Sequence, residues 1–126
     1  MNQVSLTEFQ KMLKAQGLPR EDYAFKCPVC GTIQSARDLI AAGAGKTFEE
    51  VERYLAFSCV GRWTGIGQHK LDREPGWGCD WTLGGLLKVH SVEVVTRAGI
   101  FPRFEPVTPE EAKKHLSEPI KLPPKK

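Results

Sequence analysis

The stretch Cys27-Pro28-Val29-Cys30-Gly31 decides the fold of this chain. Two cysteines at positions i and i+3 of a tight turn direct both sulfurs to one point, and the glycine after them lets backbone N–H groups approach the sulfurs. A turn of this kind supplies half of a tetrahedral zinc site. The stretch therefore predicts a domain that is organised around a metal ion.

The second half of the predicted site comes from Cys59 and Cys79, because the chain contains four cysteines and the turn uses two of them. The spacing is C-x2-C, then 28 residues, then C-x19-C, so the second pair is not close in sequence. We predict one Zn²⁺ held by Cys27, Cys30, Cys59 and Cys79, with His69 as a substitute for either of the last two. A redox pair and unligated thiols stay open as alternatives.

Four thiolates would close the zinc site, because they leave no ligand position for water or substrate, and the metal would then be structural. Such a site carries a formal double negative charge, so Lys26 and Arg62 are predicted to contact the sulfurs. A catalytic metal would need an open position, for which the region near His69 is the candidate. The other two histidines, His90 and His115, are expected to be an ordinary strand residue and an exposed helix residue.

The segments around the turn predict an α+β domain: a zinc-ribbon-like four-cysteine site with short β-strands and helical insertions. Helices are predicted by capping residues followed by apolar positions at helical spacing, over residues 6–16, 35–42 and 48–54 and from residue 108 onward. Strands are predicted by extended or β-rich composition, at residues 23–26, 32–34, 56–60, 79–82, 86–96 and 100–105.

A single domain is predicted over residues 1–117, because the chain has 126 residues, 40% hydrophobic and 26% charged. Residues 118–126 contain three prolines and three lysines and are expected to form a disordered basic tail. Removing residues 119–126 lowers the number of Lys and Arg residues from 18 to 15, which equals the number of Asp and Glu residues. The folded part is therefore neutral and lacks the broad basic surface of a nucleic-acid-binding domain.

Residues 61–78 are predicted to form a long loop that contains five of the twelve glycines. Tryptophans near it serve either as a cover for the metal site or as a recognition surface. Trp81 is expected to be buried, and Trp63 and Trp77 to be exposed. The predicted partner-binding residues are Trp63, Trp77, Arg62, Lys70 and Arg73.

Three other patterns fail as catalytic or nucleotide-binding motifs. The segment 43–47 resembles the end of a phosphate-binding loop, but Ile40 stands where the first glycine is needed. The Gly65-Ile66-Gly67 pattern lacks its last glycine, since Lys70 occupies that position. No serine lies in a nucleophile elbow, so no catalytic residues are predicted.

Three segments together resemble an uncharacterised family of short proteins encoded by bacteriophages and prophages. They are KCPVCGTIQSARDL (residues 26–39), FSCVGR (57–62) and GCDWTLGGL (78–86). The resemblance extends from the first helix to about Glu111 and places Cys59 and Cys79 in family-like blocks. It implies a phage-related gene expressed in a bacterial cytoplasm, and it implies no activity.

These observations favour a non-enzymatic, zinc-stabilised protein that docks on a host or phage protein and inhibits a host machine such as a defence system. The alternative is a nucleic-acid-binding zinc ribbon that uses residues 63–73 and the basic tail. A small metalloenzyme is a third hypothesis. No membrane span of roughly 20 apolar residues and no signal peptide is visible, so a cytoplasmic protein is expected. No small-molecule substrate is evident.

Overall fold

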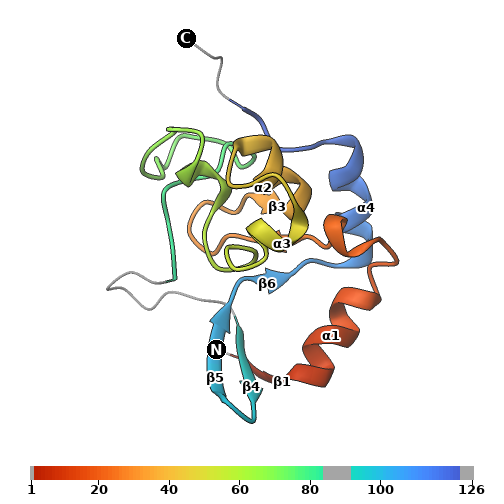
Figure 1. Ribbon diagram of the computed structural model, residues 1–126. Coiled ribbons are helices and arrows are strands. Elements are labelled where there is room, and N and C mark those ends of the chain that lie inside the picture. Colours follow the sequence, from red (N-terminus) through yellow and green to blue (C-terminus); the bar gives the residue numbers. More distant parts are fainter. Residues whose placement is uncertain (1, 84–91, 123–126) are drawn as a thin grey trace.

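The computed structural model describes residues 2–83 and 92–122. Two three-stranded sheets and four α-helices make up this part of the chain, so the predicted α+β class is confirmed (Figure 1). One sheet lies within a helical body that holds the cysteines. The other extends from one end of that body. Within the described residues, no helix is long and apolar enough to cross a membrane.

The sheet inside the body surrounds the CPVCG turn. It contains β2 (Phe25–Lys26), β3 (Ile33–Gln34) and β6 (Glu105–Pro106), in the antiparallel order β3-β2-β6. Phe25 pairs with Gln34 in β3 and with Pro106 in β6. The strands predicted around the turn are therefore present, although each is short. Pairing with β6 ties the turn to the C-terminal half of the chain.

The predicted capping residues begin the helices. These are α1 (Leu6–Lys14), α2 (Ala36–Ala42), α3 (Phe48–Val51) and α4 (Pro109–Ser117). The hydroxyls of Ser5, Ser35, Thr47 and Thr108 each accept a hydrogen bond from the N–H three residues later, which satisfies a free donor of the first turn. The third helix ends earlier than predicted, at Val51.

The outer sheet has the order β1-β4-β5, from β1 (Asn2–Ser5), β4 (Val92–Thr96) and β5 (Gly99–Arg103). β1 runs parallel to β4, and β5 runs antiparallel to it. The sequence analysis missed β1, because four residues directly before a helix show no strand pattern of their own. Of the predicted strand 86–96, residues 86–91 lie outside the described part.

The predicted strand 56–60 is wrong. Ala56 has a positive φ of 60°, which an extended strand does not allow. Cys59 instead precedes the short 3₁₀ helix η2 (Val60–Arg62). The predicted strand 79–82 is likewise reduced to a single antiparallel bridge between Ser58 and Thr82.

The buried Gln16, two residues after α1, joins this helix to Ala24 just before β2 and to Val107 just after β6. The Gln16 side-chain amide donates to the carbonyls of Ala24 and Val107, at 3.0 Å each, and its oxygen accepts the Ala24 N–H at 2.9 Å. Both the nitrogen and the oxygen of this buried amide are thereby hydrogen-bonded. The contact fixes how α1 packs on the body.

The prediction of a disordered tail is wrong for residues 118–122. Ile120 is buried, and the Lys121 N–H donates to the Gly76 carbonyl at 2.8 Å. The Lys121 ammonium also pairs with Glu74. An apolar side chain among prolines and lysines is sufficient to anchor this segment on the loop. Residues 123–126 lie outside the described part.

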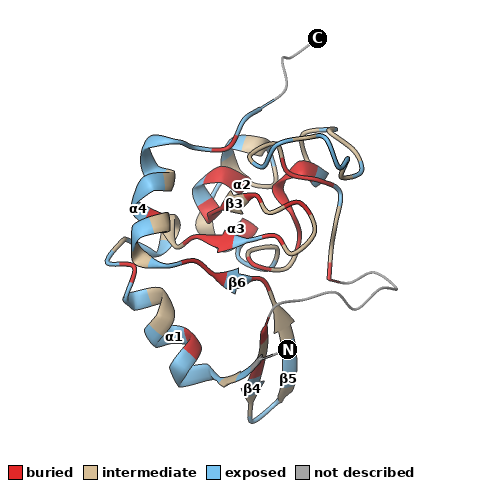
Figure 2. Ribbon diagram, turned by 180° about the vertical axis from the view of Figure 1, so that it is seen from behind, coloured by how far each residue is buried: buried red, intermediate tan, exposed pale blue. Residues whose placement is uncertain are grey.

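Buried residues concentrate around α2, β3 and the segments beside them (Figure 2). All four cysteines belong to this core, together with Leu39, Val51, Val60 and Phe104. Large parts of α1, α4 and β5 are exposed (Figure 2). The cysteine cluster therefore lies within the main buried core of the described residues.

Candidate metal centre

The four cysteines form one buried cluster. Their sulfurs all lie within 4.8 Å of one another, with 3.9 Å between Cys27 and Cys79 and 3.7 Å between Cys30 and Cys59. All four are free thiols rather than disulfides. Four sulfurs at about 2.3 Å from a tetrahedral Zn²⁺ are about 3.8 Å apart. The donor set and its spacing therefore suit a structural metal such as zinc.

The CPVCG turn places the first pair of sulfurs. The Gly31 N–H donates to the Cys27 carbonyl, and the Cys27 N–H donates to the Thr32 carbonyl, both at 3.0 Å. Gly31 has a φ of +71°, which favours glycine at this position. The local sequence is therefore sufficient to form this half of the cluster.

The second pair of sulfurs is placed by contacts between distant segments. The Cys59 N–H donates to the Trp81 carbonyl at 2.9 Å, and the Cys79 N–H donates to the Cys59 sulfur at 3.2 Å. Beside them the backbones of Gly61 and Gly78 touch. A Cβ atom at Gly61 would lie 2.4 Å from the Cys79 nitrogen, and one at Gly78 would lie 2.6 Å from the Gly61 nitrogen. Two glycines in the long loop are thus required for the cluster to close.

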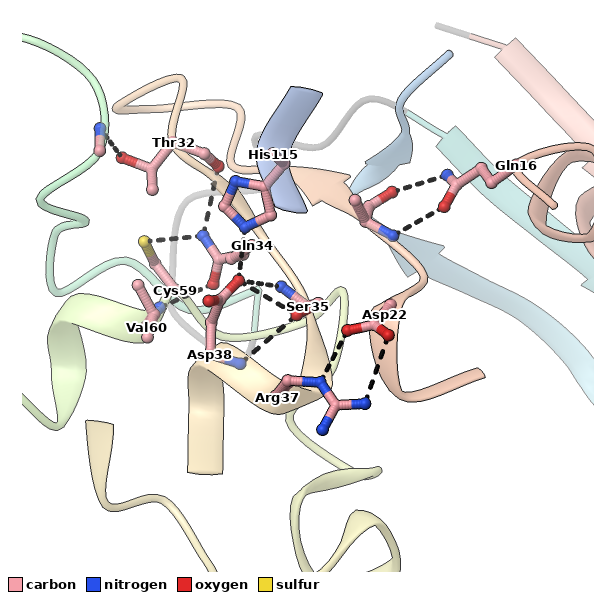
Figure 3. A network of polar contacts seen from close by, with 12 residues as sticks. Gln16, Asp22, Thr32, Gln34, Ser35, Arg37, Asp38, Cys59, Val60 and His115 are labelled. Carbon is pink, nitrogen blue, oxygen red and sulfur yellow. Dashed lines mark hydrogen bonds and ion pairs between the residues drawn. The ribbon is translucent and has the colours of Figure 1, made fainter. Parts of the chain in front are cut away.

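Neutral polar side chains surround the sulfurs, and sequence reasoning missed them (Figure 3). The Gln34 amide donates to the Cys59 sulfur at 3.3 Å, and its oxygen accepts the Val60 N–H at 2.7 Å. The Thr32 hydroxyl oxygen accepts from the Cys30 thiol at 3.2 Å. Thr32 directly precedes β3 and Gln34 ends it, and their spacing of two residues is the signal that could have placed both on the side of the cysteines.

The predicted cationic contacts to the sulfurs are wrong. Lys26 is exposed. Arg62 is also exposed and donates to the Asp80 carbonyl at 2.8 Å, not to a sulfur. The cluster is buried, and burying an ammonium or guanidinium group beside it would cost far more than pointing neutral N–H groups at the sulfurs.

Hydrogen bonds couple the protonation of the sulfurs. Hydrogen bonding to Cys30 raises the pKa of the Cys27 thiol, and the same contact lowers the pKa of Cys30. Hydrogen bonding to Cys27 also lowers the pKa of Cys59. A divalent metal that binds all four sulfurs must displace the protons of the thiols, so metal binding at this cluster is expected to release protons.

The substitute ligand, His69, lies outside the cluster. Among the described residues, only the four cysteines bring three or more ligand atoms together. His69 is half-buried, and its Nδ1 atom has no hydrogen-bond partner in the described part of the chain. The geometry therefore favours the four-cysteine set over a set that contains this histidine.

The expectation that His115 is exposed is wrong. Its Nε2 atom lies 2.6 Å from Asp38 Oδ2, and its side chain is 9% exposed (Figure 3). Asp38 also accepts from the Ser35 N–H, as the N-terminal cap of α2 requires. Ala112, one helical turn before His115, is buried too, so this face of α4 packs on the body. The pair fastens α4 to α2.

The three tryptophans do not differ in burial as predicted, since all three are half-buried. Trp63 packs against Tyr54, with ring centroids 4.8 Å apart. The Lys121 ammonium lies 5.8 Å from the Trp77 ring centroid. The indole nitrogen of Trp81 is buried without a hydrogen-bond partner among the described residues.

Of the five predicted partner-binding residues, two line one cleft. Arg62 and Trp63 line a common cleft with Arg53. Lys70 is exposed, and Arg73 is half-buried and donates to the Gln68 carbonyl at 3.3 Å. Neither of these two, nor Trp77, lines that cleft.

Comparison with known proteins gives one match. A family model described as VVA0879-like matches residues 5–107, a range that contains the four cysteines and most of the core. That description names neither an activity nor a partner. No curated protein and no solved structure matches the chain.

Proposed function

Because the chain belongs to the VVA0879-like family, whose description names no activity, we propose a function from the site itself: a non-enzymatic, zinc-stabilised binding protein that docks on another protein. The observation that carries this proposal is the enclosure of the four sulfurs. All four are buried, and the N–H groups of Gln34 and Cys79 donate to the Cys59 sulfur. A metal with four sulfur ligands has no position for substrate.

Zinc is the metal that the donor set favours, because four thiolates in a tetrahedron are its usual structural ligands. Cys27, Cys30, Cys59 and Cys79 would hold it. When bound, such an ion contributes about 10–16 kcal/mol of apparent binding free energy to folding. It would join the CPVCG turn to residues 59–62 and 79–82. The segments on either side of these residues would thereby be held in place as well.

The docking role is supported by the surface next to the metal centre. Gly61 of η2 lies against the Cys79 backbone, and Arg62 at the end of η2 and Trp63 after it line a cleft. Tryptophan and arginine are the residue types that contribute most to protein interfaces. The resemblance to phage- and prophage-encoded proteins supports a host or phage protein in a bacterial cytoplasm as the partner, with inhibition of a host defence system as its consequence.

Two charge observations favour a protein partner over nucleic acid. The chain without residues 119–126 has as many acids as bases. One of the tail lysines, Lys121, is already paired with Glu74. The body therefore has no net excess of positive charge to attract phosphates, whose contacts supply most of the affinity for nucleic acid.

Zinc X-ray absorption and metal analysis of freshly purified protein test the metal role. The expected result is one zinc per chain with four sulfur neighbours at about 2.3 Å. Three protein ligands plus an oxygen neighbour would instead support a catalytic metal. Folded protein without zinc would overturn the proposal.

The docking role is tested by capture of partners from bacterial lysate with the zinc-loaded chain and with a Trp63→Ala variant. A protein partner that is lost on Trp63→Ala supports docking through this surface. Recovery of nucleic acid that is released by moderate salt would contradict it, because counterion release makes such binding steeply salt-dependent.

A further inference from the structure

A cleft of about 550 Å³ lies between the end of α3 and η2. Three aromatic rings, Tyr54, Phe57 and Trp63, line it, and its charged side chains are Arg53 and Arg62. This volume is within the roughly 300–1,000 Å³ of clefts that hold ligands. The cleft is therefore large enough to receive side chains of a partner.

The charge of this cleft is not balanced. Arg53 and Arg62 line it without any Asp or Glu, whereas the three other described clefts combine cations with acids. Neither guanidinium forms an ion pair within the described part of the chain. Residues 84–91, which lie outside it, contain no acid in sequence. On an otherwise neutral body, the cleft is a local site of positive charge.

Each guanidinium has donors to spare. Arg53 donates from Nη2 to the Tyr54 hydroxyl at 2.6 Å, and Arg62 donates from Nη1 to the Asp80 carbonyl at 2.8 Å. A guanidinium carries five N–H donors in a planar fork that matches a carboxylate. The donors that are left over on two exposed arginines suit an anionic ligand.

The contacts of the Tyr54 ring favour a carboxylate over a nucleic-acid base beside Arg53. The Arg53 guanidinium lies 4.7 Å from the Tyr54 ring centroid, and the Trp63 ring lies 4.8 Å from it. A base needs an open ring face on which to stack. A guanidinium stacked on a ring keeps its N–H edge free for a carboxylate.

The cleft is also attached to the metal centre. The Ser58 and Thr82 hydroxyls, which line it, lie 2.9 Å apart, and the next residue along, Cys59, bonds to Trp81 through its N–H. The same bridge thus shapes the cleft and positions a ligand sulfur. Loss of the metal is therefore expected to disrupt both the shape of the cleft and the position of Cys59.

We propose that this cleft binds an acidic segment of the partner protein, with a carboxylate between Arg53 and Arg62 and a neighbouring apolar side chain on the rings of Phe57 and Trp63. The inference rests on the proposed docking function and names the chemistry of its partner. It adds Arg53, which the sequence analysis did not single out.

Selection from a random peptide library on the zinc-loaded full chain tests this inference, with counter-selection on the Arg53→Ala/Arg62→Ala double variant. Enriched peptides are expected to contain Asp or Glu beside an aromatic or aliphatic residue. Their affinity, measured by fluorescence anisotropy, should fall at least about tenfold on either single Arg→Ala change. Arg97→Ala, an exposed arginine outside the cleft, is the matched control and should leave the affinity unchanged.

Several results would overturn the inference. They are an absence of enrichment over the double variant, enrichment of basic or uncharged peptides, and affinity that is indifferent to Arg53 and Arg62. Binding of a (dT)20 oligonucleotide that both arginine changes abolish would assign the cleft to nucleic acid instead. A lysate partner that survives both changes but is lost on Trp63→Ala would refute the acidic segment and leave the docking function standing.

Discussion

The four-cysteine body and the outer sheet β1-β4-β5 are held together in different ways. In the body, four cysteines and the polar side chains of Thr32 and Gln34 are buried among apolar residues such as Leu39 and Phe104. In the outer sheet, Val92 and Val94 are buried in a regular ladder of paired strands, and the opposite face is exposed. We therefore expect the body to depend on metal binding as well as on apolar burial, and the sheet to depend on apolar burial alone.

This difference indicates which interactions stabilise each region of a chain of this length. The segments that bring Cys59 and Cys79 together are loops and one short 3₁₀ helix, which have few hydrogen bonds of their own. A metal bound to the four sulfurs would hold these segments together in place of regular structure. In the outer sheet, regular pairing between strands joins the backbone groups, and the buried Val92 and Val94 belong to the same apolar core as the cysteines.

Removal of one ligand cysteine, or of the metal itself, is expected to have the largest effect on stability. Cys59→Ser, or strong chelation of the wild-type protein, should unfold the body, because the metal's contribution of about 10–16 kcal/mol matches or exceeds the stability of a typical domain. Two-dimensional NMR spectra and zinc content measure the loss. Added Zn²⁺ should restore the chelated wild type but not the variant. A well-dispersed spectrum of the zinc-free variant would refute the comparison.

Gly61→Ala is expected to have the next largest effect. The added methyl would lie 2.4 Å from the Cys79 nitrogen, so the backbone around the second pair of sulfurs must shift. We expect a loss of about 3 kcal/mol, at the upper end for overpacking, measured by urea unfolding. The control is Gly65→Ala, which has no neighbour within 4 Å and suffers only from its φ of +76°. Equal losses in both variants would contradict the close approach.

Gln34→Leu should weaken the metal site without unfolding the protein. It removes the N–H donor to the Cys59 sulfur and leaves the Val60 N–H without its partner. Loss of such an outer contact typically lowers metal affinity by about 10–100-fold. Competition with a chromophoric chelator measures it. The control is Gln10→Leu, at an exposed position of α1, which should leave zinc affinity unchanged. An equal loss of zinc affinity in both variants would show that the hydrogen bond from Gln34 to the Cys59 sulfur is unimportant.

The smallest effects are expected in the outer sheet, where two adjacent residues of β4 form a matched pair. Val94 is 4% exposed and Val95 is 40% exposed. Val94→Ala should cost about 1.5–2 kcal/mol for two lost buried methyl groups, and Val95→Ala should change stability by less than about 0.5 kcal/mol. Neither should alter zinc affinity. A Val94→Ala variant that releases zinc would mean that the two regions fold as one metal-dependent unit.

The sequence by itself determined the features that depend on neighbouring residues. The helix starts at Ser5, Ser35, Thr47 and Thr108 were predictable because a cap hydroxyl bonds to an N–H only three residues away. The CPVCG turn was predictable for the same reason. The grouping of the four cysteines followed from their number and from the half-site that the turn forms.

Only the tertiary structure decided which groups surround the metal and which face the solvent. Gln34 reaches Cys59 across 25 positions, His115 meets Asp38 across 77, and Gln16 joins Val107 across 91. The cleft of Arg53 and Arg62 likewise depends on tertiary packing, because residues of the segments 53–58 and 62–63 line it together with Thr82. No local pattern specifies such contacts, since each depends on where the rest of the chain has already packed, and this is why the predicted cations at the sulfurs and the exposed histidine were wrong.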